Sequence, residues 1–513
     1  MGNIKVGITV WYFFCFTFCI AADVKVTVKG LAPIATIYDD FICATLDWWP
    51  TSKCNYDQCP WGHSGLFSLD LDNKILLNAV KAFNPLRIRI GGSLQDQVEY
   101  QVQNSSKRCL PFQKSEAGLF GFTAGCLTTH RWDQLNHFFN QTRAKITLGL
   151  NALVGRKKSS QKDSTLWFGD WDSKNAGNLM KYTVSKGYKI DSYELGNELC
   201  SNGVAARVEA EQYGKDMTVL KKLVQQVYPN QNTQPKVLGP GGFFDDKWFK
   251  TFLQVSGPNV VNGLTHHIYN LGAGSDPTLA NKVQDPYFLD QIRKVYSNVS
   301  ATVKQFGAWT EAWVGESGGA YNSGSKKVSY SFSDGFWYLD QLGMTSTFNH
   351  KVFCRQTLIG GNYGLLNTTT FVPNPDYYGA LLWHRLMGKN VLAANHVGSP
   401  YLRAYSHCSK QKPGITVLLI NMSNSTTFNV SIQNDGNASG SGEVQREEYH
   451  LTPKDRDIFS DVILLNGIPL VLTKSSDIPV MNPKLVNAFL PIVVAPHSIV
   501  FAVVRGFNAP ACS

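Results

Sequence analysis

Residues 191–242 contain the sequence pattern that most clearly indicates the fold. It opens with DSYELGNE (191–198), continues through AEQYGKDMTVLKKLVQQVY (210–228) and closes with KVLGPGG (236–242). The outer segments are short apolar or β-branched runs, and the middle segment has apolar residues at three- and four-residue spacing, so the pattern predicts strand, helix, strand. Two strands joined by a crossover helix are the repeating unit of a parallel sheet.

The same unit recurs on both sides of this stretch. Strands are also predicted for FICATLD from Phe41, LRIRIGG from Leu86, KITLGLNAL from Lys145, GLTHHIYN from Gly263, AWVGESGG from Ala312 and KVFCRQTLIGG from Lys351. Amphipathic helices are predicted for RWDQLNHFFNQTR from Arg131 and YFLDQIRKVYSNV from Tyr287. Eight strand-helix units predict an α/β fold, a (β/α)8 TIM barrel, over residues 36–388.

The hydrophobic period changes to two after about Gly388. GITVLLINMS from Gly414, TTFNVSI from Thr426, DVILLNG from Asp461 and HSIVFAVVRG from His497 read as strands separated by turn-rich stretches. They predict a β-sandwich domain over residues 389–513. Val24, Val26 and Val28 alternate with polar residues near the start of the chain, so residues 23–35 are expected to add a strand to a sheet of the sandwich.

The composition is that of a well-packed globular protein. Of 513 residues, 43% are hydrophobic and 17% charged, which excludes disordered and fibrous classes. The net charge of +10 comes without a run of five or more like charges, so we expect no nucleic-acid partner. A basic secreted surface explains this charge, and attraction to an acidic polysaccharide or another anionic substrate is the alternative.

The first 22 residues predict a signal peptide. Lys5 precedes an apolar stretch from Val6 to Ile20 that ends in Ala21 and Ala22, and no later stretch is long enough for an integral membrane segment. We therefore expect a secreted protein, in the cell wall or another extracellular space or in the vacuole, and a monomer. Glycosylation sequons fit this route; they begin at Asn104, Asn140, Asn298, Asn367, Asn421, Asn424, Asn429 and Asn437.

Nine cysteines would remain after the signal is removed, so at least one thiol is unpaired. Short separations make Cys54–Cys59 and Cys109–Cys126 plausible disulfides, and Cys408–Cys512 would tie the end of the chain to the start of its last domain.

Two acidic residues close predicted barrel strands. Glu198 ends the fourth strand, and Glu316 ends the seventh. Reacting groups of such barrels project from the carboxyl ends of the strands, and two facing carboxylates are what glycosidic-bond cleavage requires. Glu194 and Glu311 are rivals that lie earlier, and deeper, on the same strands. The alternative interpretation is that all four acids are non-catalytic surface or ion-pair groups.

The neighbours of these acids favour the catalytic reading. Asn197 can donate to a sugar hydroxyl, and the glycines after Glu316 allow the backbone to approach a ring closely. His266 and His267 near the end of the sixth strand are interpreted as hydrogen-bonding core residues rather than metal ligands, because no third ligand stands at a recognisable spacing. No metal and no cofactor are expected.

At these residues the sequence resembles glycoside hydrolase family 79, the heparanase and β-glucuronidase family, and most closely its plant members. The resemblance covers nearly the whole mature chain. It is carried by CATLDWWP from Cys43, CNYDQCPWG from Cys54, LRIRIGGSLQD from Leu86, ELGNEL from Glu194, THHIYNLG from Thr265, WVGESGGAYNSG from Trp313, FCRQTLIGGNYGLL from Phe353 and NPDYYGALLWHRLMG from Asn374.

The resemblance implies a role for each site residue. Glu198 would be the general acid/base and Glu316 the nucleophile of a retaining double displacement, with Tyr269 hydrogen-bonded to Glu316. The substrate-binding residues would be Asn197 at the hydroxyl next to the anomeric carbon, Asp47 and Ser93 at the non-reducing end, Tyr321, Asn322 and Ser323 in a loop whose amides hold the uronic carboxylate, and Gln356 and Tyr363 closing the pocket. Asn322 and Ser323 stand where family members have glycines.

The expected activity is that of a retaining exo-β-glucuronidase. Its substrate would be a glucuronide, either of a small molecule such as a flavonoid or in an acidic cell-wall glycan. Three alternatives stay open: a related retaining glycosidase with another sugar specificity, a transglycosidase, and a non-catalytic polysaccharide-binding protein.

Overall fold

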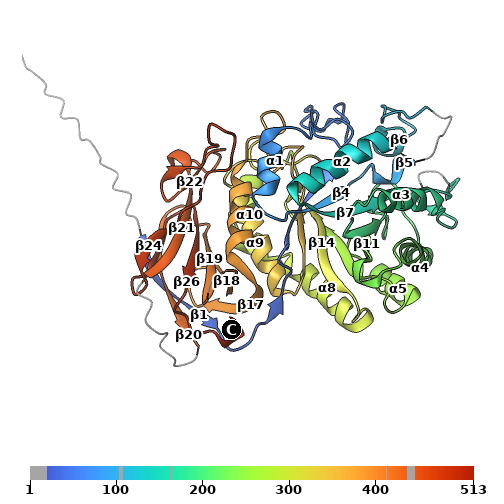
Figure 1. The fold of residues 1–513 in the computed structure, drawn as a ribbon. Coiled ribbons are helices and arrows are strands. Elements are labelled where there is room, and N and C mark those ends of the chain that lie inside the picture. Colours follow the sequence, from blue (N-terminus) through green and yellow to red (C-terminus); the bar gives the residue numbers. More distant parts are fainter. Residues whose placement is uncertain (1–19, 103–107, 162–163, 412, 436–444, 513) are drawn as a thin grey trace, which may run out of the picture.

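Eight parallel strands close into a barrel in a computed structural model that describes residues 20–102, 108–161, 164–411, 413–435 and 445–512 (Figure 1). Around the barrel the strands are β3 (Ile42–Asp47), β4 (Arg87–Gly91), β7 (Lys145–Leu150), β10 (Ser192–Leu195), β11 (Lys236–Phe243), β12 (Gly263–Ile268), β14 (Glu311–Ser317) and β16 (Phe353–Arg355). β16 pairs with β3, which completes the ring. The predicted (β/α)8 fold and its eight strands are confirmed.

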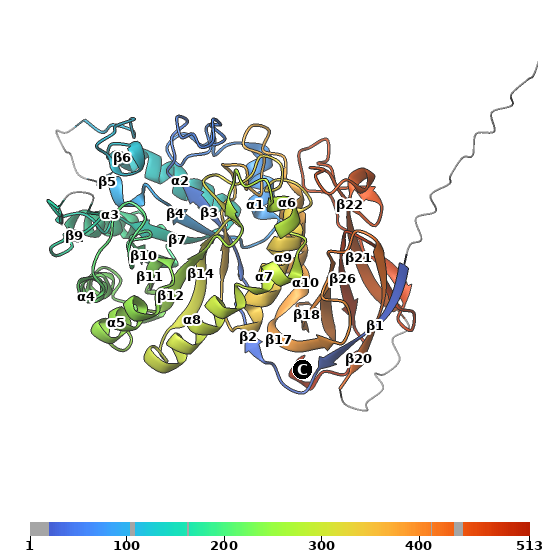
Figure 2. The same cartoon turned by 180° about the vertical axis from the view of Figure 1, so that it is seen from behind.

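Helices pack around the outside of this ring (Figures 1 and 2). The longer helices are α1 (Lys74–Lys81), α2 (Thr129–Thr142), α3 (Lys174–Ser185), α4 (Ala210–Val227), α5 (Asp246–Ser256), α8 (Arg293–Phe306), α9 (Asp334–Thr347) and α10 (Pro375–Leu386). The side chains of Tyr213, Met217, Leu220 and Val224 form the buried stripe of α4, at the spacing that predicted it. The helix predicted from Tyr287 is instead two: α7 (Pro286–Asp290) and α8, separated at Gln291 and Ile292.

Short elements decorate the barrel. They are β5 (Val98–Gln101), β6 (Gly125–Thr128), β8 (Lys157–Lys158), β9 (Trp167–Phe168), β13 (Gly272–Ala273), β15 (Ala320–Tyr321) and α6 (Leu279–Lys282). Another short strand, β2 (Ala35–Thr36), pairs instead with β17 (Met387–His396) of the second domain. β13 and β15 pair beside the carboxyl ends of β12 and β14. They therefore fix the loops that follow the sixth and seventh barrel strands.

The second domain is all-β. Its strands are β17 (Met387–His396), β18 (Leu402–Ser409), β19 (Ile415–Asn421), β20 (Thr426–Asn434), β21 (Gln445–Pro453), β22 (Ile463–Leu465), β23 (Ile468–Pro469), β24 (Lys484–Asn487), β25 (Ile492–Val494) and β26 (Ser498–Val504). The hydrogen-bonded path folds back on itself, so Val430 on β20 and Ile492 on β25 pack with Val417 on β19 and Val500 on β26 in one apolar core.

The N-terminal strand belongs to this second domain. β1 (Ile20–Lys29) pairs antiparallel with β17 and parallel with β20, and Val24, Val26 and Val28 are buried in the core of the sandwich. The first residues of β1 overlap the end of the predicted signal peptide. Residues 1–19 of that segment lie outside the described residues, so the signal stays a prediction.

The two domains share a continuous apolar interior. Trp383 on α10 and Phe336 on α9 belong to the same buried cluster as Leu418 on β19 and Phe501 on β26. The last two barrel helices therefore provide the face against which the sandwich packs, as Figure 2 also shows for α9 and α10.

Four disulfides link described cysteines. Cys54–Cys59, Cys109–Cys126 and Cys408–Cys512 are formed as predicted. The fourth, Cys43–Cys354, joins β3 to β16, the first and last barrel strands, and was not predicted. Cys200 is a free, buried thiol, so the expectation of an unpaired cysteine is confirmed.

The asparagine of one predicted glycosylation sequon, Asn421, is buried in the folded protein. Asn421 is fully buried, and its Nδ2 donates to the carbonyl oxygens of Thr426, Val494 and Ala495. The sequons at Asn104 and Asn437 lie outside the described residues. Asn421 is therefore unavailable for glycosylation once the sandwich has formed.

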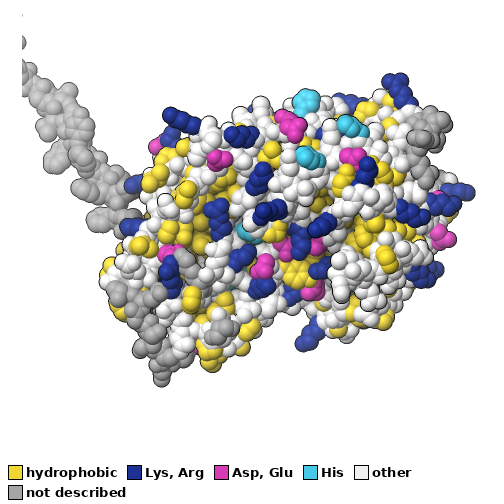
Figure 3. Space-filling view, in the orientation of Figure 1, with side chains coloured by type: hydrophobic (Ala, Val, Ile, Leu, Met, Phe, Trp, Pro, Cys, Tyr) yellow, Lys and Arg dark blue, Asp and Glu magenta, His cyan; other side chains and the backbone are white. Residues whose placement is uncertain are grey.

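Charged groups are spread over the surface. Lys and Arg side chains lie over both domains on the face shown in Figure 3, with acidic side chains between them. No helix in the described ranges is long and apolar enough to cross a membrane.

Candidate active site

A cavity of about 460 Å³ lies over the carboxyl ends of the barrel strands. Nine of the eleven predicted site residues line it: Ser93, Glu198, Tyr269, Glu316, Tyr321, Asn322, Ser323, Gln356 and Tyr363. The other two, Asp47 and Asn197, are buried and hydrogen-bonded to residues of the same site. The fold therefore brings the predicted residues to one place.

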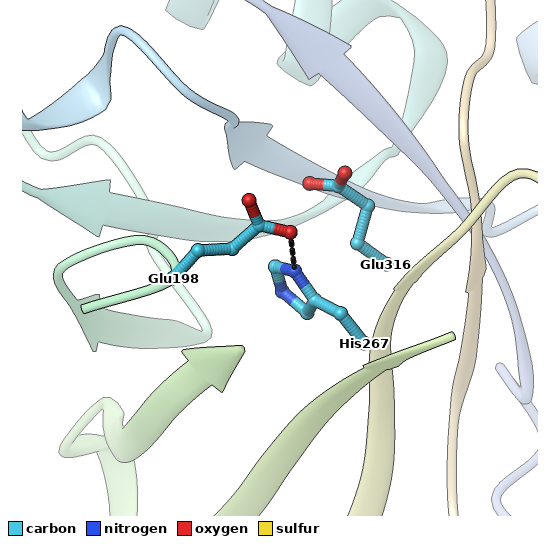
Figure 4. A group of neighbouring side chains, drawn as sticks. All are labelled: Glu198, His267 and Glu316. Atoms are coloured by element: carbon cyan, nitrogen blue, oxygen red, sulfur yellow. Dashed lines mark hydrogen bonds and ion pairs between the residues drawn. The ribbon is translucent and has the colours of Figure 1, made fainter. Parts of the chain in front are cut away.

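Glu198 and Glu316 approach each other from different strands (Figure 4). Glu198 follows β10, Glu316 is on β14, and both side chains are largely buried. One carboxylate oxygen of each, together with a ring nitrogen of His267, lies in a group whose members are all within 4.8 Å of one another. Glu198 has a φ of 54°, a left-handed conformation that is costly for a residue other than glycine.

Both oxygens of Glu316 have a hydrogen-bond donor. Tyr269 donates from its hydroxyl to Oε1 at 2.6 Å, and Arg89 donates from Nη1 to Oε2 at 2.7 Å. The predicted contact between Tyr269 and Glu316 is therefore present. These two donors fix the direction of the Glu316 carboxylate.

Arg89 connects the acids of two strands. Its Nε donates to Oε2 of Glu194 at 2.7 Å, and its Nη2 donates to Oδ1 of Asn197 at 2.8 Å. Glu194 is thus an ion-pair partner beneath the cavity. The other rival acid, Glu311, lies at the start of β14, where it accepts from the hydroxyl of Tyr38.

The backbone before Glu198 is held by another buried acid. Asp96 accepts from the N–H groups of Asn197 and Ala152, both at 2.8 Å. Burial raises the pKa of Asp96 to about 7, against the opposing effect of these backbone hydrogen bonds. Arg89 and Asp96 together fix Asn197 from its side chain and its backbone.

Asp47 is buried behind the cavity wall, where it contacts Gln356, a residue that lines the cavity. Gln356 donates from Nε2 to Asp47 Oδ2 at 3.0 Å, and Oδ1 of Asp47 is buried without a hydrogen-bond partner among the described residues. Burial, with the charge of Glu316, raises the pKa of Asp47 to about 8. Gly92 is required here, because a Cβ at this position would lie 2.5 Å from Asp47 Oδ2.

The loop of Tyr321, Asn322 and Ser323 keeps the conformation that glycine would favour. Asn322 has a φ of 56° and Ser323 a φ of 71°, although both carry side chains. Ser323 Oγ accepts from Trp61 Nε1 at 2.9 Å and donates to Asn55 Oδ1 at 2.8 Å. Side-chain hydrogen bonds to the loop after β3 thus stabilise a left-handed backbone conformation that is strained for residues other than glycine.

The two histidines differ in role. His266 is bonded to His350 at 2.9 Å, and burial lowers the pKa of His266 well below its usual value, as expected for a core residue. His267 instead reaches Glu198, with Nδ1 2.9 Å from Oε1. Both histidines are thus buried and hydrogen-bonded, as expected, and His267 in addition contacts the proposed acid/base.

Several residues of the site were not predicted. Trp49, Lys53, Asn55, Trp61, Phe120, Val204 and Phe243 also line the cavity. The sequence did contain a signal for Arg89. Alternate residues of a strand share a face, so Arg87 and Arg89 of RIRIG project to one side of β4 and the isoleucines project to the other. The loop residues carried no such signal, since their place depends on the loop path.

Glu198, His267 and Glu316 are also the one group of potential metal ligands found among the described residues. Both oxygens of Glu316 are already bonded by Arg89 and Tyr269, and the arginine supplies the positive charge that a cation would bring. The donor set therefore does not fit a metal ion well.

A (β/α)8 barrel with two buried glutamates facing each other over one cavity is an arrangement that glycoside hydrolases with paired carboxylates use. The sequence matches the glycosyl hydrolase family 79 N-terminal domain over residues 23–343. The chain belongs to this family.

Curated relatives cover almost the full length. The chain is 52% identical to heparanase-like protein 2 of Arabidopsis thaliana, over 95% of this chain and 94% of the relative. It is 41% identical to baicalin-beta-D-glucuronidase of Scutellaria baicalensis, over 92% and 91% of the two chains. The family and these relatives identify an enzyme that hydrolyses glycosidic bonds.

Solved structures share the architecture at low identity. A 4-O-alpha-L-rhamnosyl-beta-D-glucuronidase from Fusarium oxysporum aligns with a TM-score of 0.65 at 14% identity, over 94% of this chain and 100% of the other. A GH51 arabinofuranosidase from Xanthomonas axonopodis aligns with a TM-score of 0.66 at 14% identity, over 94% and 99% of the chains. At this identity the likeness shows the fold alone.

Proposed function

We propose that this protein is a retaining exo-β-glucuronidase. It removes terminal glucuronic acid from a small-molecule glucuronide, such as that of a flavonoid, or from a cell-wall glycan. The observation that carries the proposal is the close approach of Glu198 and Glu316, with one oxygen of each within 4.8 Å. Retaining enzymes hold their two carboxyl groups about 5 Å apart, whereas inverting enzymes leave about 6.5–9.5 Å for a water.

The hydrogen bonds support the assignment of one glutamate as the nucleophile and the other as the general acid/base. Glu316 is held by Arg89 and Tyr269 in a fixed direction, which suits the carboxylate that attacks the anomeric carbon. Glu198 is bonded to His267, which suits a group that gives and takes a proton.

The reaction then proceeds in two displacements. In the first, the protonated Glu198 donates its proton to the glycosidic oxygen while Glu316 attacks C1, so the bond to the leaving group breaks and a glycosyl ester forms. In the second, Glu198 takes a proton from water, the water oxygen attacks C1, and Glu316 leaves as a carboxylate. Both glutamates end as they began.

The remaining residues would bind the sugar. Asn197 would hold the hydroxyl next to C1, while Asp47, Ser93, Gln356 and Tyr363 would bind the far side of the ring. The loop of residues 321–323 would offer backbone N–H groups to the uronic carboxylate. The β-glucuronidase relative from Scutellaria baicalensis supports this sugar class.

Secretion is part of the proposal. Four disulfides are typical of proteins that fold in oxidising compartments, and they accompany the signal segment predicted for residues 1–22. We expect a monomer that acts in the cell wall or the vacuole.

One experiment tests the sugar and the stereochemistry together. Purified protein is incubated with matched 4-nitrophenyl β-D-glucuronide, β-D-glucoside and β-D-galacturonide, and the first-formed sugar is observed by proton NMR. The glucuronide should be hydrolysed fastest, with release of the β-anomer. A preference for another sugar, or first release of the α-anomer, would contradict the proposal, and added alcohol acceptors would reveal a transglycosidase by its transfer products.

A further inference from the structure

Lys53 is the only lysine or arginine among the described residues that line the cavity. It lies in the loop after β3, and its Nζ stands 4.2 Å from the centroid of the Trp49 ring. No described carboxylate forms an ion pair with it. The ammonium group therefore has an aromatic face as its neighbour but no counter-charge.

The surroundings of the Lys53 ammonium group disfavour its positive charge. Lys53 is half-buried, and burial lowers the pKa of its ammonium group. A buried charge without a partner is unfavourable, and the arrival of an anion removes that penalty. Lys53 is thus prepared for a negatively charged ligand.

The other charges of the site create the need for such a group. Glu316, the attacking carboxylate of the proposed mechanism, lines the same cavity, so an anionic sugar would add a second negative charge to the cavity. Arg89 cannot offset this charge, because its guanidinium already bonds Glu194, Glu316 and Asn197. The cation that remains is Lys53.

The loop that carries Lys53 is tied to residues 321–323. A Cys54–Cys59 disulfide closes it. Asn55 accepts a hydrogen bond from Ser323 Oγ, and Asn322 Nδ2 donates to the hydroxyl of Tyr56 at 3.2 Å. The ammonium group and the proposed carboxylate-binding amides therefore belong to one connected wall of the cavity.

We propose that Lys53 is a specificity-determining residue whose ammonium group pairs with the carboxylate of the bound glucuronic acid. It would work together with the backbone amides of residues 321–323. The inference rests on the proposed function and adds to it the residue that separates a uronide from the corresponding neutral sugar.

The test compares two substrates in three proteins. The values of kcat/KM for 4-nitrophenyl β-D-glucuronide and β-D-glucoside are measured for the wild type, Lys53→Met and Lys53→Arg. A charge-assisted hydrogen bond predicts that Lys53→Met loses about 10- to 100-fold on the glucuronide, mainly through KM, while its activity on the glucoside stays within about twofold. Lys53→Arg should recover part of the loss.

Lys327→Met is the matched control. Lys327 is an exposed lysine whose Nζ also stands over an aromatic ring, 4.1 Å from Phe459, and it does not line the cavity. Its replacement should leave the ratio of the two substrates unchanged. Inhibition by free D-glucuronic acid gives a second measurement, and it should weaken in Lys53→Met by the same factor as KM.

The outcomes separate this inference from the proposed function. A wild-type enzyme that prefers the glucuronide, with the same preference in Lys53→Met, would overturn the role of Lys53 alone. Equal loss on both substrates would also overturn it, because that result indicates a structural role. A wild-type enzyme without preference for the glucuronide would overturn the proposed function itself. Should Lys53→Met fail to fold, Lys53→Gln serves in the same assays.

Discussion

The Nη1 atom of Arg89 lies 2.7 Å from Oε2 of Glu316, although the two residues are 227 positions apart and their strands, β4 and β14, are separated in the barrel by β3 and β16. The same guanidinium bonds Glu194 at 2.7 Å. One arginine therefore sets the position of the proposed nucleophile against a fixed ion pair beneath the cavity. Arg89 does not line the cavity, so we regard it as a positioning residue.

Arg89→Lys should reduce kcat by at least about 100-fold with a small change in KM, because one ammonium group cannot replace three directed N–H donors. The kinetic parameters of the variant on the glucuronide check this. Arg87→Lys is the control. Arg87 lies two residues earlier on β4, where it pairs with Asp40 and Asp191, so its replacement should lower the melting temperature while kcat is retained. Equal losses of kcat in both variants would contradict the positioning role.

Glu316→Gln should abolish hydrolysis of every substrate, because the glycosyl ester cannot form. Glu198→Ala should keep measurable turnover of a nitrophenyl glucuronide, whose leaving group needs little protonation, and added azide should raise that turnover by attacking the ester in place of activated water. Glu311→Gln is the matched control at the other end of β14 and should stay within about twofold of the wild type. Azide rescue of Glu316→Gln instead would reverse the two assignments.

Asp47 should make the folded protein less stable as the pH rises. Burial and the charge of Glu316 raise the pKa of Asp47 to about 8. Between about pH 4 and pH 8 the folded state then holds a proton that the unfolded state has lost, so the free energy of unfolding falls with increasing pH. Asp47→Asn removes this effect, and its melting temperature relative to the wild type should be higher at pH 8 than at pH 4.5.

Asp40 provides the control of opposite sign. Burial raises its pKa, but the ion pairs with Arg87 and Lys145 outweigh burial and hold the pKa below its usual value. Its contribution to stability is present above the unfolded pKa of about 4 and is lost below it. Asp40→Asn should therefore cost more stability at pH 8 than at pH 3. If the stabilities of the Asp47 and Asp40 variants, relative to the wild type, change in the same direction with pH, the opposite pKa shifts of the two carboxyl groups are contradicted.

Replacing Cys43 and Cys354 by serine should destabilise the barrel. Their disulfide closes a stretch of 311 residues, and chain-entropy arguments assign about 6 kcal/mol to a loop of that size. The control replaces Cys54 and Cys59, whose bridge spans 5 residues and should contribute about 2 kcal/mol. Denaturant unfolding followed by tryptophan fluorescence compares the two, and a larger loss in the Cys54/Cys59 variant would contradict the entropic account.

The sequence was sufficient for the barrel because its strand pattern is local. Each strand is a short apolar run bounded by turns, so the eight could be found one at a time. The break between α7 and α8 was not visible, since apolar spacing continues across Gln291 and Ile292. The Cys43–Cys354 disulfide was missed because its two strands become neighbours only when the barrel closes.

In the candidate site, too, the residues at strand ends could be predicted from the sequence, whereas the residues in loops could not. Glu198 and Glu316 were predicted because strand ends in a barrel converge, which needs no knowledge of the loops. Lys53 could not be predicted, since its position in the cavity depends on how the loop of Cys54 and Cys59 folds against Ser323. The left-handed backbone at Asn322 was equally hidden, because the sequence shows only that a side chain stands there.

The pairing of β1 between β17 and β20 has a consequence for biosynthesis. β1 lies near the start of the chain and cannot pair until β17 and β20 have been synthesised. All eight barrel strands precede β17 in the sequence, so the barrel can form before the sandwich is complete. A fragment that starts at residue 389 would expose the edges that β1 covers, so expression of the second domain alone should give aggregates, and a separately supplied β1 peptide should rescue its solubility.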